Sequence, residues 1–184
     1  MKPTLAGALA AAALASFPAP ATAADTYLVA KLGYFGPTAE VVATGGNVGQ
    51  LDPRFYWELG VGMNASFLGL ELSGGRFSST NATLQLTTSS IPVLLSVRLR
   101  IPIPVFTPYI ELGGGAFFND VEIPGLFSES HTTWGYLAGG GIDFRFSSLL
   151  IGVEARYLSA EAGIPYVTLR VDGVTVTGNL GFYF

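Results

Sequence analysis

The sequence has 184 residues, of which 49% are hydrophobic and only 12% are charged, so it is not a disordered, highly charged segment. Nine Lys and Arg against 13 Asp and Glu give a net charge of -4, which excludes a nucleic-acid binder with a basic face. Cysteine is absent and His131 is the one histidine, which excludes disulfides, thiolate chemistry and His-rich metal sites. We therefore expect no metal and no cofactor.

The N-terminus has the pattern of a secretory signal peptide. Lys2 supplies the positive charge, residues 5–17 are apolar and rich in alanine, and Ala21-Thr22-Ala23 offers small residues for cleavage. We expect residues 1–24 to be removed and residues 25–184 to form one domain. No later apolar run approaches the roughly 18 residues that a transmembrane helix needs.

Apolar and polar residues alternate over eight segments of the remaining chain, which predicts β-strands with two different faces. In one of them, Phe55, Trp57 and Leu59 alternate with Tyr56, Glu58 and Gly60. The segments are residues 25–35, 54–64, 68–73, 93–100, 107–118, 133–146, 149–158 and 174–184. The predicted fold is all-β: a closed, eight-stranded, antiparallel up-and-down transmembrane barrel.

The charged residues support this interpretation, because all of those within the segments share the face that carries the glycines. A charge on the lipid-facing side of a barrel costs roughly 2 to 4 kcal/mol at the bilayer midplane, so charges are expected to point inward. We predict that they form a charge network in the barrel lumen, and the members are Lys31, Arg54, Glu58, Glu71, Arg98, Arg100, Glu111, Asp143, Arg145, Glu154 and Arg156.

The connections alternate between long and short. Residues 36–53, 78–90, 119–132 and 159–169 read as long loops, and the links near residues 64–66, 102–104 and 147–148 are short. Short turns are expected at the periplasmic side and long loops outside. Pro92, which cannot donate to a closed ladder, is expected at the outer entry of the fourth strand.

Aromatic residues near the segment ends are expected to form two girdles at the membrane interfaces. They are Tyr27, Tyr34, Phe35, Phe55, Trp57, Phe106, Phe118, Trp134, Tyr157 and Phe184.

The segments AKLGYF, SIPVLLSVRLRIP, TPYIELGGGAFF, GGGIDFRF and IGVEARYL, and the end on an aromatic residue, resemble the small eight-stranded outer-membrane β-barrels. This family includes the OmpA-like transmembrane domain and the opacity-type porin-family proteins. The resemblance implies a Gram-negative cell envelope, export through the periplasm and insertion into the outer membrane. It also implies that Leu180, Phe182 and Phe184 are the signal read by the barrel assembly machinery, although Asn179 stands where the commonest form of that signal has glycine.

Two interpretations of the predicted lumen remain open. Paired charges can fill the interior of a small barrel, or the same charged residues can line a path for ions. We favour a lumen that is largely plugged, and a structural or surface-interaction role without catalysis. A small-solute channel is the alternative.

A lipid A-modifying enzyme is a weaker alternative. Residues 155–165 faintly resemble the active-site strand of lipid A deacylases, but Leu158 and Ala160 stand where the base and the nucleophile would be. His131 follows Ser128 and Glu129 in a predicted loop, where we expect a solvated side chain rather than a triad.

The predicted partners follow from the same reading. They are outer-membrane lipid and lipopolysaccharide, with periplasmic chaperones and the assembly machinery during biogenesis. We expect a monomer that binds no nucleic acid, because the residues outside the strand cores are mostly acidic. These residues are Asp25, Glu40, Asp52, Asp120, Glu122, Glu129, Glu161 and Asp172, against Arg76 and Arg170.

Overall fold

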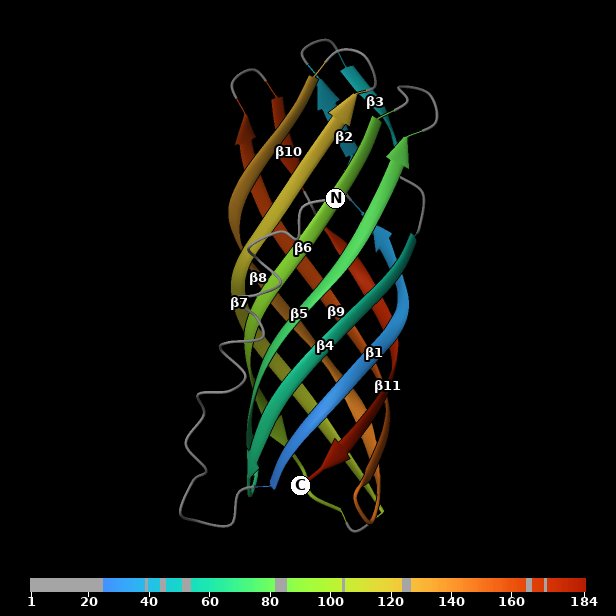
Figure 1. Ribbon diagram of the computed structural model, residues 1–184, viewed down its shortest axis with the longest axis vertical. Helices are drawn as coiled ribbons and strands as arrows, with labels where there is room; N and C mark the ends of the chain where they lie inside the picture. The colour runs from blue at the N-terminus through green and yellow to red at the C-terminus, as the bar shows by residue number, and fades with distance from the viewer. Residues whose placement is uncertain are drawn as a thin grey trace, which may run out of the picture.

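Eight tilted strands close on themselves in the computed structural model (Figure 1). The strands are β1 (Asp25–Pro37), β4 (Arg54–Ala65), β5 (Leu68–Asn81), β6 (Leu86–Arg100), β7 (Phe106–Ile123), β8 (Phe127–Phe146), β9 (Leu149–Ile164) and β11 (Gly173–Tyr183). Each pairs antiparallel with the next, and β11 pairs with both β9 and β1. The predicted fold, a closed eight-stranded antiparallel barrel, is confirmed.

Three short strands extend the sheet beyond the ring. They are β2 (Glu40–Ala43), β3 (Gly46–Gln50) and β10 (Val167–Arg170), which continue from β9 in the order β10-β2-β3. The structure describes residues 25–38, 40–43, 46–50, 54–81, 86–103, 105–123, 127–164, 167–170 and 172–184. The predicted signal peptide lies outside these residues. Within these ranges, none of the structure is a helix long and apolar enough to cross a membrane.

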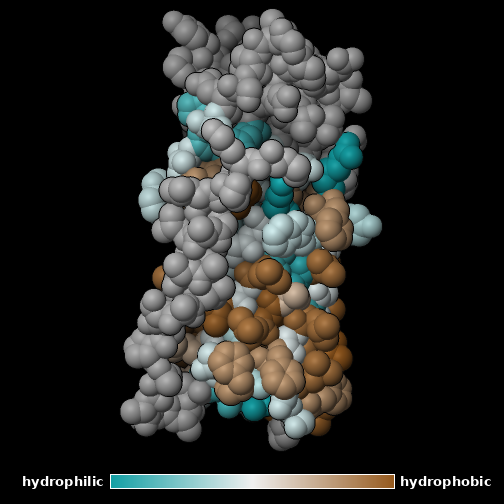
Figure 2. Space-filling model, viewed as in Figure 1, coloured by the Kyte–Doolittle hydropathy of each residue, from teal (hydrophilic) through white to brown (hydrophobic). Residues whose placement is uncertain are grey.

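The two faces of the barrel wall have opposite polarity. Leu70, Val97 and Ile142 point outward and are 44%, 49% and 39% exposed, whereas Lys31 and Glu58 point inward and are at most 1% exposed. In Figure 2 the hydrophobic residues gather in the lower half of the molecule, towards the end where the short turns lie, with hydrophilic residues above them. An exterior of this kind suits hydrocarbon rather than water.

The height of the apolar band matches a membrane. Along β7 the outward positions are apolar or glycine from Phe106 to Phe118, and the next one is the exposed Asp120. At about 3.3 Å per residue and a strand tilt of about 40°, this run rises about 30 Å along the barrel axis. The apolar belt of such barrels is about 25 Å tall, so Asp120 and, on β5, the outward Arg76 lie at or beyond its rim.

The strands are longer than their sequence pattern predicts, and the predicted long loops are correspondingly wrong in extent. β5 and β6 pair as far as Asn81 and Leu86, and β7 and β8 as far as Ile123 and Phe127. The link 36–53 also contains β2 and β3. Apolar and polar residues alternate only where one face of a strand contacts lipid and the other faces the interior. The alternation therefore ends where the strands leave the membrane, although backbone pairing continues. The short links are confirmed: the turns lie at residues 66–67 and 147–148, and residues 101–103 carry no strand.

Pro92 does not lie at the entry of its strand, as predicted, but inside β6, opposite Phe117 of β7. On its other side, the pairing of β5 with β6 runs to Gly74↔Val93 and resumes at Phe77↔Ser90. The missing N–H of proline thus coincides with a gap in the ladder, which is how the closed barrel accommodates it.

Two members of the predicted aromatic girdles face the interior. Tyr27 and Phe35 are 1% and 2% exposed, whereas Tyr34 of the same strand is 67% exposed. The odd-numbered positions of β1 share a face with Lys31, so neither ring can reach the lipid interface.

Candidate functional site: the barrel interior

An ion network occupies the middle of the barrel. Seven of the predicted lumen charges meet there, and each is at most 3% exposed. They are Lys31 of β1, Glu58 of β4, Glu71 of β5, Arg98 of β6, Glu111 of β7, and Glu154 and Arg156 of β9. We call these seven residues the interior ion network; its four carboxylates and three cations come from six strands.

Strand register brings these side chains together. Lys31 is directly opposite Glu58, and Arg98 is directly opposite Glu111, all on the inward face. Glycine provides space beside the longest side chain, because a Cβ at Gly139 would lie 2.7 Å from Cγ of Arg156. The inward glycines therefore allow arginine to lie within a narrow lumen.

Lys31 lies at the centre of the network. Its Nζ is 3.2 Å from Glu58 Oε1, 2.7 Å from Glu71 Oε1 and 3.0 Å from Glu154 Oε1. An ammonium group carries three protons, so these three carboxylates can satisfy it. One side chain thereby joins β1 to β4, β5 and β9.

The two arginines extend the network across the lumen. Arg98 Nη2 lies 2.8 Å from Glu71 Oε2 and 3.0 Å from Glu154 Oε2, and its Nε is 3.1 Å from Glu111 Oε2. Arg156 Nη2 lies 2.8 Å from Glu58 Oε2, and its Nε is 2.8 Å from Glu154 Oε1. Buried ions are tolerated when they are paired in this way.

Three inward tyrosines donate to the carboxylates; alternation put Tyr56 and Tyr109 on the face of the charges without giving them a role, and Tyr27 was expected in a girdle. The hydroxyl of Tyr27 donates to Glu71 at 2.9 Å, that of Tyr109 donates to Glu154 at 2.7 Å, and that of Tyr56 donates to Glu58. The guanidinium carbon of Arg98 also lies 4.6 Å from the centre of the Tyr109 ring. The sequence did carry a signal for their inward position. Tyr56 and Tyr109 lie two residues before Glu58 and Glu111, and Tyr27 lies four before Lys31, so each tyrosine shares the face of a lumen charge.

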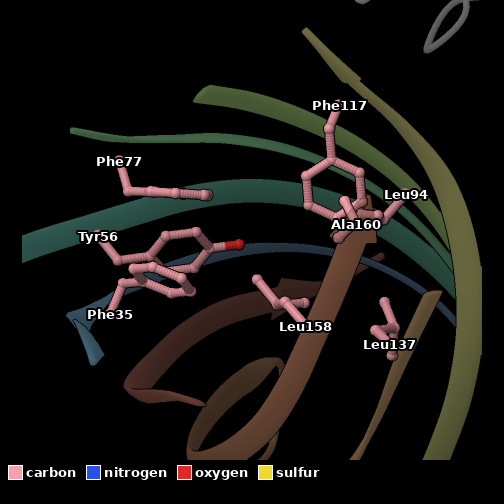
Figure 3. Packing of buried hydrophobic residues seen from close by; sticks show 8 residues of the cluster. All are labelled: Phe35, Tyr56, Phe77, Leu94, Phe117, Leu137, Leu158 and Ala160. Carbon is pink, nitrogen blue, oxygen red and sulfur yellow. The ribbon is translucent and has the colours of Figure 1, made fainter. Parts of the chain in front are cut away.

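An apolar layer covers the network on the side of the long links. It consists of Phe35, Tyr56, Phe77, Leu94, Phe117, Leu137, Leu158 and Ala160. Phe35 and Phe77 stack with ring centres 4.3 Å apart, and Figure 3 shows side chains from several strands converging on the same region. On each strand that carries a network residue, the layer residue lies beyond it towards the long-link end, as Leu158 lies beyond Arg156; Leu137 comes from β8, which contributes no network residue.

A smaller apolar cluster lies on the side of the short turns, formed by Tyr27, Val29, Leu150 and Tyr183. The four other predicted lumen charges lie outside the ion network. Three are near the short-turn end: Asp143 is buried, Arg100 is half-buried, and Arg145 is 46% exposed and pairs with Asp25. Arg54 is exposed and lies at the opposite, long-link end, where it begins β4 opposite Phe35. The inward face continues past the membrane at each barrel mouth. Alternation along a strand therefore shows that a charge points inward, but not whether it lies in the middle of the barrel.

The other residues that the sequence singled out lie as follows. Leu158 and Ala160 belong to the apolar layer, and His131 lies in β8 opposite Asn119 rather than in a loop. Leu180, Phe182 and Phe184 point outward and are 57%, 56% and 71% exposed. Among the side chains that the structure places, no group of three or more His, Cys, Asp or Glu could hold a metal ion.

A closed barrel with an apolar exterior and an ionic interior defines an integral β-barrel protein of the bacterial outer membrane. The chain belongs to the outer membrane protein beta-barrel domain family, whose model matches residues 8–184. A comparison with curated proteins found no match.

Solved structures show the same fold at low sequence identity. The chain is similar to Neisserial surface protein A, with 14% identity and a TM-score of 0.67 over 89% of this chain and all (100%) of that one. It is also similar to the outer membrane protein OprG of Pseudomonas aeruginosa, with 15% identity and a TM-score of 0.65 over 88% of this chain and 96% of that one. The N-terminal β-barrel domain of OprF from the same species has a TM-score of 0.51 at 12% identity, over 86% and 97% of the two chains.

Proposed function

We propose that the protein is a non-enzymatic outer-membrane barrel whose lumen is largely plugged, with a structural or surface-interaction role. The observation that carries this proposal is the stack of layers across the interior. The ion network joins six strands, and the apolar layer lies directly on it.

The energetics of the two layers support a closed lumen. Water entering the network would have to separate charged groups that lie about 3 Å apart. These side chains are almost fully buried, so little of their surface is open to water. Water entering the apolar layer would meet only apolar side chains and the Tyr56 hydroxyl, which already bonds to Glu58, and apolar cavities stay dry for lack of polar partners. An ion would therefore pay for desolvation twice along one path.

The proposed orientation places the short turns in the periplasm and the strand extensions β2, β3 and β10 at the cell surface. The chain would reach the outer membrane through the periplasm after cleavage of residues 1–24, bound by chaperones and then by the assembly machinery. Leu180, Phe182 and Phe184 would be the assembly signal. The mature protein would be a monomer in contact with lipid and lipopolysaccharide, with no nucleic-acid partner.

The competing hypothesis is a small-solute channel, and recordings from planar lipid bilayers separate the two. We expect the purified wild-type protein to show no stepwise conductance. A channel would give steps that disappear when Arg98 and Glu111 are both replaced by tryptophan.

The hypothesis of a lipid A-modifying enzyme has its own test. Lipid A from cells that overproduce the protein should have the same mass spectrum as lipid A from cells with the empty vector. A lost or gained acyl chain would contradict the non-enzymatic proposal. Leu158 and Ala160 lie within the apolar layer, where they offer no acid, base or nucleophile.

A further inference from the structure

A cavity of about 420 Å³ opens inside the barrel at the short-turn end. The residues that matter to its chemistry are Asp25, Asn64, Arg100, Asp143, Arg145 and Tyr183. It lies on the opposite side of the ion network from the apolar layer. Its volume falls in the range of small-molecule sites, about 300 to 1,000 Å³.

Two acceptors in the cavity wall are buried without a partner. Asp143 is 5% exposed, and within the described ranges its Oδ1 accepts no hydrogen bond and its carboxylate has no cation within ion-pair distance. Asn64 is also 5% exposed; its Nδ2 donates to the Tyr183 hydroxyl at 3.5 Å, while its Oδ1 accepts no hydrogen bond from the residues that the structure places. A buried acceptor that is left unpaired is costly, and a buried carboxylate more so.

One cation of the cavity is unpaired as well. Arg100 is half-buried and makes neither a hydrogen bond nor an ion pair with any residue that the structure places. Arg145, in contrast, is already held by Asp25 and lies over the Tyr183 ring at 4.2 Å. The wall therefore presents one cation and one anion that are near enough to interact electrostatically but form no ion pair with each other.

We propose that this cavity binds a small zwitterion, a molecule with an ammonium and an acidic group the size of an amino acid. The acidic group would pair with Arg100, and the ammonium would donate to Asp143 and to Oδ1 of Asn64. A simple anion would pair with Arg100 but would be repelled by Asp143. A simple cation would pair with Asp143 but would be repelled by Arg100. Only a ligand with both charges satisfies both sides, because charge-assisted hydrogen bonds are the strong ones.

The inference is independent of whether the lumen conducts, because the cavity lies on one side of the proposed plug. It concerns a binding site and not a pathway. A conducting barrel could still bind the zwitterion, and a closed barrel could fail to bind it. The two proposals can therefore fail separately.

The test uses the refolded mature protein in detergent micelles, followed by NMR of its backbone amides. Glycine is the probe, and acetate and methylammonium present its two halves separately. We expect saturable shifts at Asn64, Arg100 and Asp143 with glycine, and an affinity at least about tenfold lower for either half. Equal responses to the three probes, or no response to glycine, would overturn the proposal and leave a cavity that holds only water.

Two substitutions localise the site. Asp143→Asn keeps the shape of the side chain and Arg100→Gln keeps a shorter polar one, and each should weaken glycine binding about tenfold because it removes one of the two charges. The matched controls, Asp120→Asn and Arg76→Gln, make the same chemical changes on the exposed outward face and should leave binding unchanged. Among the described residues the Arg100 side chain makes no hydrogen bond or ion pair that its replacement would break, so Arg100→Gln remains informative if Asp143→Asn does not fold. Full glycine binding by Arg100→Gln would also overturn the proposal.

The same assay identifies the source of the ligand. Glycylglycine represents amino acids and short peptides, and glycerophosphoethanolamine represents a lipid headgroup with the same two charges. We expect the amino-acid ligand to bind more tightly, because a headgroup anchored in the bilayer would have to enter through the mouth of the barrel. Tighter binding of glycerophosphoethanolamine would support the zwitterion site and assign it to lipid.

Discussion

Replacing Lys31 by methionine should strongly destabilise the barrel. Lys31 is the one lysine after residue 2, and its ammonium group contacts three carboxylates at 2.7 to 3.2 Å. Methionine has nearly the same length and fits the same space, so the substitution removes the charge and little else. The four carboxylates of the interior ion network would then depend on the two arginines alone.

The magnitude follows from the geometry. Coulomb's law gives about 5 kcal/mol for one contact at 3 Å with an effective dielectric constant of about 20. Desolvation of the ammonium offsets most of the sum over three such contacts. Removal of one partner from a buried ion pair, which leaves the others uncompensated, costs about 3 to 5 kcal/mol in proteins. We expect Lys31→Met to lower the free energy of unfolding by that amount.

Reversible unfolding in urea from lipid vesicles measures this difference, with the fluorescence of Trp57 and Trp134 as the signal. Both indoles lie on the outward face and pass from lipid to water on unfolding. Heat-dependent migration on detergent gels reports separately whether each variant has formed a barrel. The double variant Lys31→Met/Glu154→Gln should recover part of the loss, because it removes one of the uncompensated charges.

Arg145→Met is the matched control. Arg145 pairs with Asp25 at the short-turn rim, where the two side chains are 46% and 50% exposed. Exposed pairs contribute about 0 to 1 kcal/mol, so this variant should unfold almost as the wild type does. If Lys31→Met were no less stable than Arg145→Met, water would have to solvate the carboxylates, and the inferred dry interior would be wrong.

Four further predictions follow from the wall of the barrel. Gly115→Ala should prevent barrel formation on detergent gels, because its Cβ would overlap the backbone oxygen of Val93, whereas Gly74→Ala should fold, because the nearest atom is 3.8 Å away. Phe117→Ala should cost about 3 to 5 kcal/mol in urea titrations by leaving a cavity in the apolar layer, while the lipid-facing Phe118→Ala should cost little. Leu112→Arg should cost about 2 to 4 kcal/mol in the same assay and Asp120→Arg about 0 to 1, because only the first charge lies within the apolar band. Deletion of Phe184 should reduce the fraction of assembled barrel in cells without changing the stability of refolded protein; equal assembly would contradict its role as a signal.

Much of the fold could be predicted because lipid imposes a strong rule on each outward position. Leu70, Val97 and Ile142 were assigned outward from alternation alone, and they are exposed. The same rule could not define the strand ends. Beyond the membrane, water accepts any side chain, so backbone pairing continues through Asn81 and Ile123 without a signature in the sequence.

The interior was harder to predict for a different reason. Parity identifies which residues point inward, but the stagger between neighbouring strands decides their height. Arg54 and Glu58 share one face of β4, yet only Glu58 reaches the ion network. The apolar layer was missed because Phe77, Leu94 and Phe117 sit on the inward face and resemble the lipid-facing residues beside them. Only the register separates the two groups.

The register itself explains why the interior is ionic although buried ion pairs add little net stability. A slip of one residue in any strand pairing exchanges the two faces of that strand. On β9 such a slip would turn Glu154 and Arg156 towards lipid, at roughly 2 to 4 kcal/mol for a basic residue near the midplane and somewhat less for an acidic one. Similar penalties on several strands would together rival the 5 to 15 kcal/mol that separates a typical folded domain from its unfolded chain. An all-apolar interior would remove these penalties, because leucine is accepted on either face. The ion network therefore acts mainly against wrong pairings, and the glycines beside it are the condition for fitting it inside so narrow a barrel.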